Sequence, residues 1–466
     1  MNWKGMLRAA LIVALGLVLS ACGGAAVRQG PSKPQTQQQV QRSVAPVATG
    51  PMRVAILAPL TGDFAPIGQQ LVNATAIALF EDQQTPVELL PFDTRGTPEG
   101  AAEAANSALR QRADMVIGPL FGKHVPVVRQ TLAGSNVAIL TFTNDTTMAG
   151  GNVFVLGISV ADQMHRMMGQ LARDGRNRVL LLGPDTAYTE HVLAALQSPN
   201  ISGPVQLVRA ATFDSAADFN SIAEQVKKLT DYDRRRANWR SYESRLVPQV
   251  RAAADPAGLL QGEAAKFAPD SVSYRMLQGM ASIYRQHISR GRNAALSEVI
   301  SRIEGVDASP ADDFDVVMLP FADENLIAVG SMLDLYNAGH PFARVVGTNL
   351  WQNEDLARGP SFHQAWYTAA DQTAQQPFLQ TYRSTYQAVP DPIAVLGYYA
   401  ARVAMSAASA NIRPVTPIFV RRPNGFSGQA GAVLFGADNL MRHPLTIYEV
   451  TPEGPREVDG QAGPSS

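Results

Sequence analysis

The feature that most constrains this chain is a regular alternation of short apolar runs with segments of helical spacing. Residues 53–58 are an apolar run that ends at Pro59, which is typical of a buried parallel strand. Helical patterns and strand-like runs then follow in turn at residues 67–78, 87–92, 97–110, 115–118, 123–132 and 137–140. Strands that alternate with helices of this length predict a parallel α/β sheet with helices on both faces.

The same alternation restarts further along the chain. Strand-like runs and helical patterns continue at residues 179–182, 189–196, 205–210, 216–229 and 314–319. We therefore predict an α/β fold of two doubly wound, Rossmann-like lobes, which a chain of 466 residues is long enough to form. Ligands of such sheets bind beyond the carboxyl ends of the strands, so a cleft between the lobes is the expected site.

A helical insertion in the second lobe is predicted at about residues 230–305. This stretch has aromatic residues at helical spacing and an excess of arginine. One interpretation is a solvated helix face, because charge runs usually face water. The other is a docking surface for a protein partner or polyanion, because Arg and Trp are enriched at interfaces. The candidates for that partner surface are Arg234, Arg235, Arg236, Trp239 and Arg240.

The N-terminus has the pattern of an export signal. Lys4 and Arg8 precede an apolar stretch over residues 9–19, about half of the ~20 residues that span a bilayer. The Leu-Ser-Ala-Cys sequence that ends at Cys22 resembles the lipobox of bacterial lipoproteins, in which the cysteine is acylated. An ordinary signal peptide with a chance cysteine is the alternative. Because Cys22 is the only cysteine, no intramolecular disulfide or multi-cysteine cluster can form, and we interpret it as a lipid anchor.

The lipobox implies a signal peptide over residues 1–21 and a lipid-anchored protein on the periplasmic side of the cell envelope. Gly23 implies the outer membrane, because lipoproteins retained in the inner membrane commonly have aspartate there. Residues 22–51 carry no acidic residue and are rich in Gly, Ala, Gln, Pro and Ser, which predicts a flexible tether. Residues 456–466 are predicted to form a disordered tail.

Composition and motifs argue against several other functions. With a formal net charge of −1, the chain lacks the basic excess of a nucleic-acid-binding protein. It has no Gly-x-Ser-x-Gly, His-Glu-x-x-His or phosphate-loop motif, and its seven histidines show no metal-ligand spacing. We therefore expect no catalytic residue, no metal site and no cofactor.

Four segments carry a family resemblance. They are Val54–Gly68 (Val-Ala-Ile-Leu-Ala-Pro-Leu-Thr-Gly-Asp-Phe-Ala-Pro-Ile-Gly), Asp114–Pro119, Asp185–Tyr188 and Gly425–Phe435. The first resembles the opening of type I periplasmic binding proteins of the leucine-binding family, and the others resemble later segments of the same family. The resemblance implies a first lobe of residues 52–157 plus 371–432 and a second lobe of residues 158–370 plus 433–455.

The family's ligand residues carry over only in part. Its small hydroxyl residues and backbone N–H groups hold a ligand carboxylate where this chain has Phe121, Gly122 and Thr143. Asp145 would repel a carboxylate, and the family's acidic residue, which pairs with the ligand's ammonium, is replaced near Asn349. The resemblance therefore implies a pocket that has lost part of its amino-acid chemistry. The candidate ligand contacts are Thr61, Phe121, Gly122, Thr143, Asp145, Tyr188, Phe321 and Asn349.

A subset of this superfamily consists of lipoprotein activators of penicillin-binding proteins, the peptidoglycan synthases. Those proteins share a lipobox, a tether and a helical insertion with Trp, Tyr and Arg, and this chain resembles them in all three respects. The resemblance implies a non-enzymatic, lipid-anchored regulator whose partner is a penicillin-binding protein. The alternative is a solute-binding receptor of an amino-acid or peptide transporter, with a small-molecule ligand in the cleft.

Overall fold

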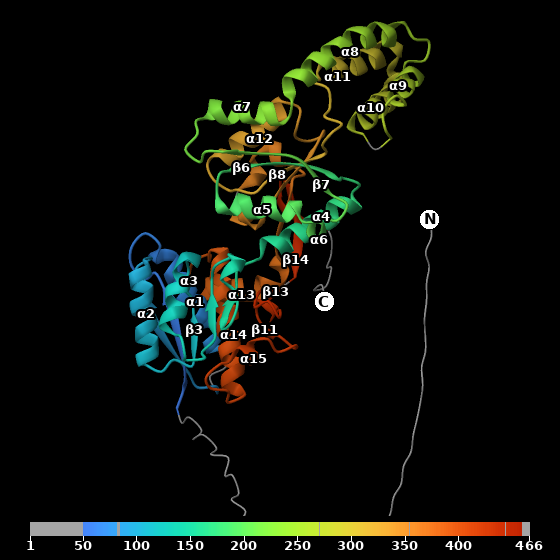
Figure 1. The fold of residues 1–466 in the computed structure, drawn as a ribbon. Coiled ribbons are helices and arrows are strands. Elements are labelled where there is room, and N and C mark those ends of the chain that lie inside the picture. Colours follow the sequence, from blue (N-terminus) through green and yellow to red (C-terminus); the bar gives the residue numbers. More distant parts are fainter. Residues whose placement is uncertain (1–49, 82–83, 270, 354, 443, 459–466) are drawn as a thin grey trace, which may run out of the picture. The chain divides into compact units, whose positions relative to one another are not determined.

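The computed structural model describes residues 50–81, 84–269, 271–353, 355–442 and 444–458 (Figure 1). No helix within these ranges is long and apolar enough to cross a membrane. The predicted signal peptide, Cys22 and nearly all of the tether lie outside the described residues, as do residues 459–466 of the predicted tail.

The first lobe is built on a five-stranded parallel sheet of order β2-β1-β3-β4-β5. Its strands are β1 (Met52–Ala58), β2 (Val87–Asp93), β3 (Met115–Ile117), β4 (Ile139–Thr141) and β5 (Val153–Val155). The connecting helices are α1 (Ala65–Phe80), α2 (Pro98–Arg110), α3 (Val125–Thr131) and the 3-10 turns η1 (Gly122–His124) and η2 (Thr146–Met148). Alternate strand residues pack on opposite faces, so α1 covers one face and α2 with α3 the other.

A later part of the chain completes this lobe. It comprises α13 (Gln372–Tyr386), η7 (Pro392–Ala394), α14 (Val395–Ser409), α15 (Pro417–Val420) and the small sheet β11 (Phe426–Gly428), β12 (Gly431–Phe435) and β13 (Met441–Arg442). Helix α14 is rich in small residues and packs closely on α1. A Cβ on Gly397 would lie 2.4 Å from the carbonyl oxygen of Leu71, so glycine is needed at this approach.

The second lobe repeats the topology of the first. Its sheet has the order β15-β14-β10-β9-β8-β6-β7, in which β7-β6-β8-β9-β10 are parallel and β14 and β15 are added antiparallel at one edge. The strands are β6 (Arg178–Pro184), β7 (Gln206–Phe213), β8 (Val316–Leu319), β9 (Arg344–Gly347), β10 (Trp366–Ala370), β14 (Leu445–Thr451) and β15 (Gly454–Glu457). The helices are α4 (Val160–Arg173), α5 (Ala187–Gln197), α6 (Pro199–Ser202), α7 (Phe219–Leu229), α12 (Asn325–Leu335), η4 (Asn349–Asn353), η5 (Leu356–Arg358) and η6 (Pro360–Phe362).

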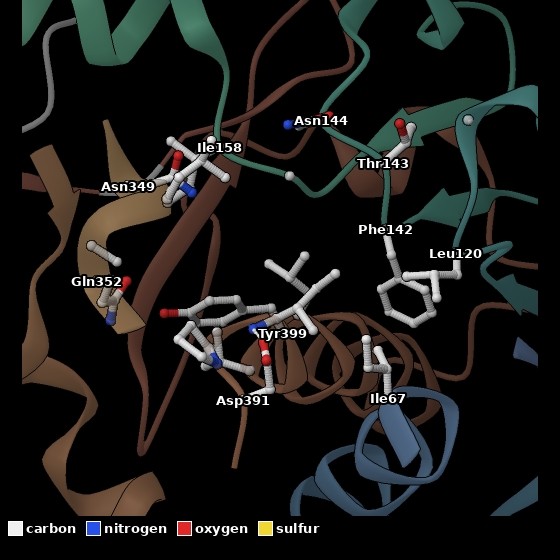
Figure 2. A pocket seen from close by; sticks show the side chains of 18 of the residues that line it. Ile67, Leu120, Phe142, Thr143, Asn144, Ile158, Asn349, Gln352, Asp391 and Tyr399 are labelled. Atoms are coloured by element: carbon white, nitrogen blue, oxygen red, sulfur yellow. Dashed lines mark hydrogen bonds between the residues drawn. The ribbon is translucent and has the colours of Figure 1, made fainter. Parts of the chain in front are cut away.

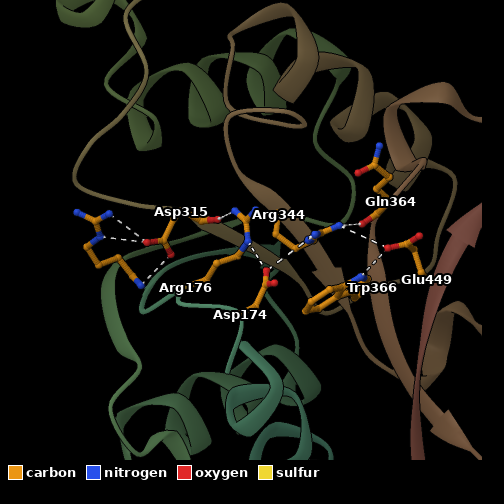
Figure 3. A network of polar contacts seen from close by, with 8 residues as sticks. Asp174, Arg176, Asp315, Arg344, Gln364, Trp366 and Glu449 are labelled. Atoms are coloured by element: carbon orange, nitrogen blue, oxygen red, sulfur yellow. Dashed lines mark hydrogen bonds and ion pairs between the residues drawn. The ribbon is translucent and has the colours of Figure 1, made fainter. Parts of the chain in front are cut away.

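A polar network joins the amino ends of the strands in this second sheet (Figure 3). The Arg344 guanidinium lies 4.2 Å from the centre of the Trp366 ring, and the Trp366 indole N–H donates to Glu449 over 3.1 Å. Arg344 is also 3.8 Å from Glu449 and 3.9 Å from Asp174. Burial lowers the pKa of Arg344. Because the network lies at the end opposite to the carboxyl ends of the strands, we assign it a structural role.

The predicted helical insertion lies between α7 and β8. It consists of α8 (Tyr232–Ala252), α9 (Pro256–Ala264), α10 (Val272–His287), η3 (Ile288–Arg290) and α11 (Arg292–Glu304), which group together in Figure 1. These helices enclose a hydrophobic core of their own, which includes Trp239, Leu246, Leu260, Leu277 and Val299. The insertion is therefore a packed subdomain rather than a single helical arm.

Two boundaries differ from those predicted from the sequence. The family resemblance places residues 433–442 in the second lobe, but Val433, Phe435 and Met441 lie in the first lobe's core, and β12 and β13 pair with each other next to β11. The chain joins the second sheet only at Leu445. At the other boundary, β15 runs to Glu457 and so extends into the segment predicted as tail.

Candidate functional site

A cavity of about 500 Å³ is lined by residues of both lobes (Figure 2). Its lining residues follow the carboxyl ends of strands in both sheets, with Phe121 after β3, Thr143 after β4, Ile158 after β5 and Asn349 after β9. This is the position expected for a ligand in open α/β sheets, and the volume is within the range of small-molecule sites. The segment from Asp391 to Tyr399 in η7 and α14 completes the wall.

Four of the eight predicted contacts line this cavity: Phe121, Gly122, Thr143 and Asn349. The backbones are closely packed here. A Cβ on Gly122 would lie 2.8 Å from Thr143 Oγ1, and a Cβ on Gly157 would lie 2.4 Å from the Thr143 carbonyl oxygen. Glycine at both positions therefore lets the loops after β3, β4 and β5 meet around Thr143.

The other four predicted contacts do not line the cavity. The Thr61 hydroxyl donates to Asp93 over 2.6 Å, and the Asp145 carboxylate accepts from the backbone N–H and hydroxyl of Thr147. Phe321 is buried against Phe213, with ring centres 5.5 Å apart. Thr61 and Asp145 therefore hold loops in place, and Phe321 packs in the core. Residue type and spacing alone do not reveal these side-chain contacts.

Tyr188, the fourth of these residues, acts behind the cavity wall. Its hydroxyl donates to Asn349 Oδ1 over 3.3 Å and accepts from Gln163 Nε2 over 3.5 Å. Gln163 Oε1 in turn accepts from the Asn349 backbone N–H over 2.9 Å and from the Thr368 hydroxyl over 3.2 Å. Gln163 is fully buried on α4, and burial raises the pKa of Tyr188. This relay positions Asn349 in the pocket.

Several lining residues were not predicted from the sequence. The aromatic ones include Phe64 and Tyr399, and the polar ones include Gln352, Gln375 and Asp391. The Tyr399 hydroxyl donates to the Ala430 carbonyl over 2.8 Å and accepts from Gln375 over 3.3 Å, and burial raises its pKa to about 12. The Asp-Pro sequence that begins η7 is a helix-start signal, but only the packing of α14 against the first sheet brings it to the pocket.

The predicted partner surface on α8 is only partly a surface. Arg235 is buried and donates to the carbonyl oxygens of Thr230, Ser309, Tyr336 and Asn337. Trp239 is 2% exposed in the core of the insertion. Both are corrections to the prediction, because residues buried in this way cannot contact a partner.

The three remaining arginines of that set are accessible. Arg234 is exposed and pairs with Asp231, and Arg236 is half-buried, 3.2 Å from Asp307 and above the Tyr232 ring. Arg240 is exposed, and no ion pair holds it within the described residues. Further exposed arginines on the insertion are Arg245, Arg251, Arg285, Arg290 and Arg292.

Comparison with known proteins finds a family model that matches the first part of the chain. Residues 51–229 match the family model described as periplasmic binding protein. The chain is similar to the penicillin-binding protein activator LpoA of Vibrio antiquarius, at 23% identity over 223 residues that cover 46% of this chain and 37% of that protein. It is also similar to the Leu/Ile/Val-binding protein BraC3 of Rhizobium johnstonii, at 25% identity over 195 residues that cover 39% of this chain and 53% of that protein. The chain thus spans about a third to a half of the length of the curated relatives it matches.

Solved structures share the fold over most of the described chain. A leucine-binding protein from Thermotoga maritima is 14% identical with a TM-score of 0.54, and the match covers 88% of this chain and 98% of that one. A solute-binding protein of an ABC transporter from Rhodopseudomonas palustris, solved with 3,4-dihydroxybenzoic acid, is 12% identical with a TM-score of 0.54, and the match covers 89% and 94%.

The chain has the two-lobed α/β fold of type I periplasmic binding proteins, as the sequence predicts. Residues 51–229 match the model of the periplasmic binding protein family, and the structural neighbours include a leucine-binding protein. The weak similarity to LpoA agrees with the predicted resemblance to penicillin-binding protein activators.

Proposed function

We propose that this protein is a non-enzymatic regulator of a penicillin-binding protein in peptidoglycan synthesis, anchored in the outer membrane through a lipid on Cys22. The observation that carries the proposal is the helical insertion, which has its own hydrophobic core and exposes arginines on three of its helices. A packed subdomain that presents guanidinium groups is suited to a protein partner, because arginine is enriched at interfaces. The similarity to LpoA supports the same partner class.

The described lining of the pocket is poor in the side chains that nucleophilic catalysis commonly uses. None of its lining residues in the described chain is a histidine, a cysteine or a lysine, and Thr143 Oγ1 accepts from the Asp145 N–H. Nucleophilic catalysis needs a nucleophile within hydrogen-bond reach of a base. The described residues also contain no group of three or more His, Cys, Asp or Glu that could hold a metal ion.

The test is a binding measurement between the full-length protein and a purified bifunctional penicillin-binding protein of the source bacterium. The test variant carries Arg240→Glu with Arg245→Glu, both exposed on α8. The control carries Arg110→Glu with Arg383→Glu, which are exposed on the first lobe and change the net charge equally. We expect the α8 variant to bind about tenfold more weakly and the control to bind like the wild type. Equal binding by all three proteins, or no binding by the wild type, would refute the proposal.

A second candidate function is a solute-binding receptor for a transporter, and the cavity is the specific observation that favours it. A receptor is stabilised by its ligand in proportion to RT ln(1 + [L]/Kd). Thermal unfolding of the full-length protein in the presence of amino acids, peptides and muropeptides separates the two candidates. A ligand-dependent rise in melting temperature without binding to the synthase supports the receptor.

A further inference from the structure

We propose that the pocket binds a small organic ligand that combines a protonated amine with an apolar body, and that Asp391 pairs with the amine. This inference extends the receptor candidate to a ligand class. It holds whether or not the insertion contacts a penicillin-binding protein, because no lining residue belongs to the insertion.

The first argument for an amine ligand is the charge of the pocket. Within the described part of the chain, Asp391 is the only lining residue with a charged side chain. A carboxylate ligand would meet this negative charge without a lysine or arginine to offset it. A cationic ligand would gain from the same charge, and more so than in water because the wall around it is largely apolar.

The second argument for an amine ligand is the position of Asp391. Its Oδ1 accepts from the Ile393 backbone N–H over 3.0 Å, and its own N–H donates to Gln70 over 2.6 Å. These bonds hold the carboxyl group at the start of η7, beside the cavity (Figure 2). No cationic side chain pairs with it among the described residues, so Oδ2 is left for a ligand. A carboxylate fixed by its own loop is a preorganised partner for an ammonium group.

The remaining lining residues define the rest of the ligand. Apolar and aromatic side chains from several elements make up most of the wall, including Phe64, Phe121, Phe142, Leu350, Leu396 and Tyr399. Phe64 and Leu350 are 45% and 38% exposed, so a bound apolar body would remove exposed apolar surface from water. At the second lobe, Asn349 Oδ1 is engaged by the Tyr188 hydroxyl, which leaves the amide nitrogen to donate to a ligand acceptor.

The sequence implied the loss of an ammonium partner, and the structure places a carboxylate in the pocket from a different element. The predicted loss concerned the second lobe near Asn349, whereas Asp391 comes from the first lobe. The amine would therefore lie against the first lobe, and an acceptor against Asn349 would contact the second. A ligand of this kind bridges the two walls of the cavity.

The experiment compares matched probes by thermal unfolding and calorimetry on the full-length protein. The amines are hexylamine, 2-phenylethylamine and tryptamine, and the anions of similar shape are heptanoate, 3-phenylpropionate and indole-3-propionate. We expect at least one amine to raise the melting temperature and its matched carboxylate to leave it unchanged. Asp391→Asn should weaken binding of that amine about tenfold or more, because a charge-assisted hydrogen bond becomes a neutral one.

Two controls show whether a loss of amine binding is due to the Asp391 carboxylate itself. Asparagine also caps helix starts, so Asp391→Asn should preserve the local fold, which its unchanged melting temperature without ligand would verify. Asp145→Asn is the matched control, because that carboxylate accepts from Thr147 and lies outside the cavity lining, and it should leave amine binding unchanged. The proposal is overturned if no amine stabilises the wild type, if carboxylates stabilise it equally, or if Asp391→Asn binds amines as the wild type does. None of these outcomes alters the test of synthase binding.

Discussion

His124 is a buried titratable residue in the same 3-10 turn as Gly122, which lines the pocket. It is fully buried in η1, and neither ring nitrogen has a hydrogen-bond partner within the described residues. Burial lowers its pKa, the positive charge of Lys123 lowers it further, and Glu99 opposes the shift. The folded protein therefore binds a proton at this site less readily than the unfolded chain, whose histidine pKa is about 6.5.

This difference predicts how stability changes with pH. Below about pH 6.5 the unfolded state binds more protons at His124, so the free energy of unfolding falls as the pH falls, by up to about 1.4 kcal/mol per pH unit. Above that pH the contribution is fully present. Urea unfolding at pH 7.5 and 5.5 measures the change, and His124→Leu should show a smaller loss than the wild type. His340, whose pKa burial also lowers, acts in the same direction and stays in both proteins. Equal losses in the two proteins would contradict the assignment to His124.

Gln163 gives a second prediction at this scale, because its amide serves Asn349, Thr368 and Tyr188 at once. Gln163→Leu would leave these buried groups without their partner and should lower the free energy of unfolding by about 2–3 kcal/mol. Gln376→Leu, on an exposed position of α13, is the control and should change it by less than about 0.5 kcal/mol. A similar effect of both substitutions in urea unfolding would show that the relay does not stabilise the fold.

At the residue scale, the sequence predicts pocket residues that lie in loops directly after strands. It does not predict the direction in which a side chain points. Gly122 and Thr143 follow strands of the first sheet, so their place at its carboxyl edge follows from the alternation. Asp145 lies two residues further on, but its carboxylate accepts from Thr147 and points into its own loop. The spacing did not predict Asp391, because it reaches the pocket from the start of η7, far in sequence from the loops after β3 and β4 that it meets there.

At the scale of elements, the residue spacing in helix α8 indicates which of its side chains are buried. Tyr232, Arg235, Trp239, Leu246 and Val250 recur at steps of three, four or seven residues and form one buried face. Arg235 therefore belongs with the core face, even though it lies within a run of three arginines. The adjacent Arg234 is exposed and the next, Arg236, half-buried. Short strands are harder to assign, because two-residue β13 and five-residue β12 carry too little pattern to identify their sheet.

The same helix gives a prediction about the attachment of the insertion. Arg235 joins α8 to the carbonyls of the segments before β8 and after α12, and burial lowers its pKa to about 10. Arg235→Ala should destabilise the protein by about 2–4 kcal/mol, because several buried carbonyls lose their donor. Hydrogen exchange should then be faster across α8–α11. Arg240→Ala, which removes an exposed arginine from the same helix, should change neither stability nor exchange, and similar effects of both substitutions would refute this role of Arg235.

At the scale of the whole molecule, the repeated sheet order explains why the fold could be predicted and the function only proposed. Two sheets of the same 2-1-3-4-5 type place their carboxyl edges around one cavity, which the alternation of strands and helices predicts. The same fold carries different ligands and partners, so the function depends on what is added to it. Here the additions are the Asp391 carboxylate in the pocket and the helical insertion with its arginines.

The central claim, that this protein regulates a penicillin-binding protein, is tested most directly by the rate of peptidoglycan synthesis. A purified bifunctional synthase is assayed on lipid II alone, with the full-length protein, and with the Arg240→Glu, Arg245→Glu variant. We predict that the wild-type protein changes the rate at saturating concentration and that the variant needs about tenfold more protein for the same effect. A synthase rate that is identical in all three reactions would contradict the claim.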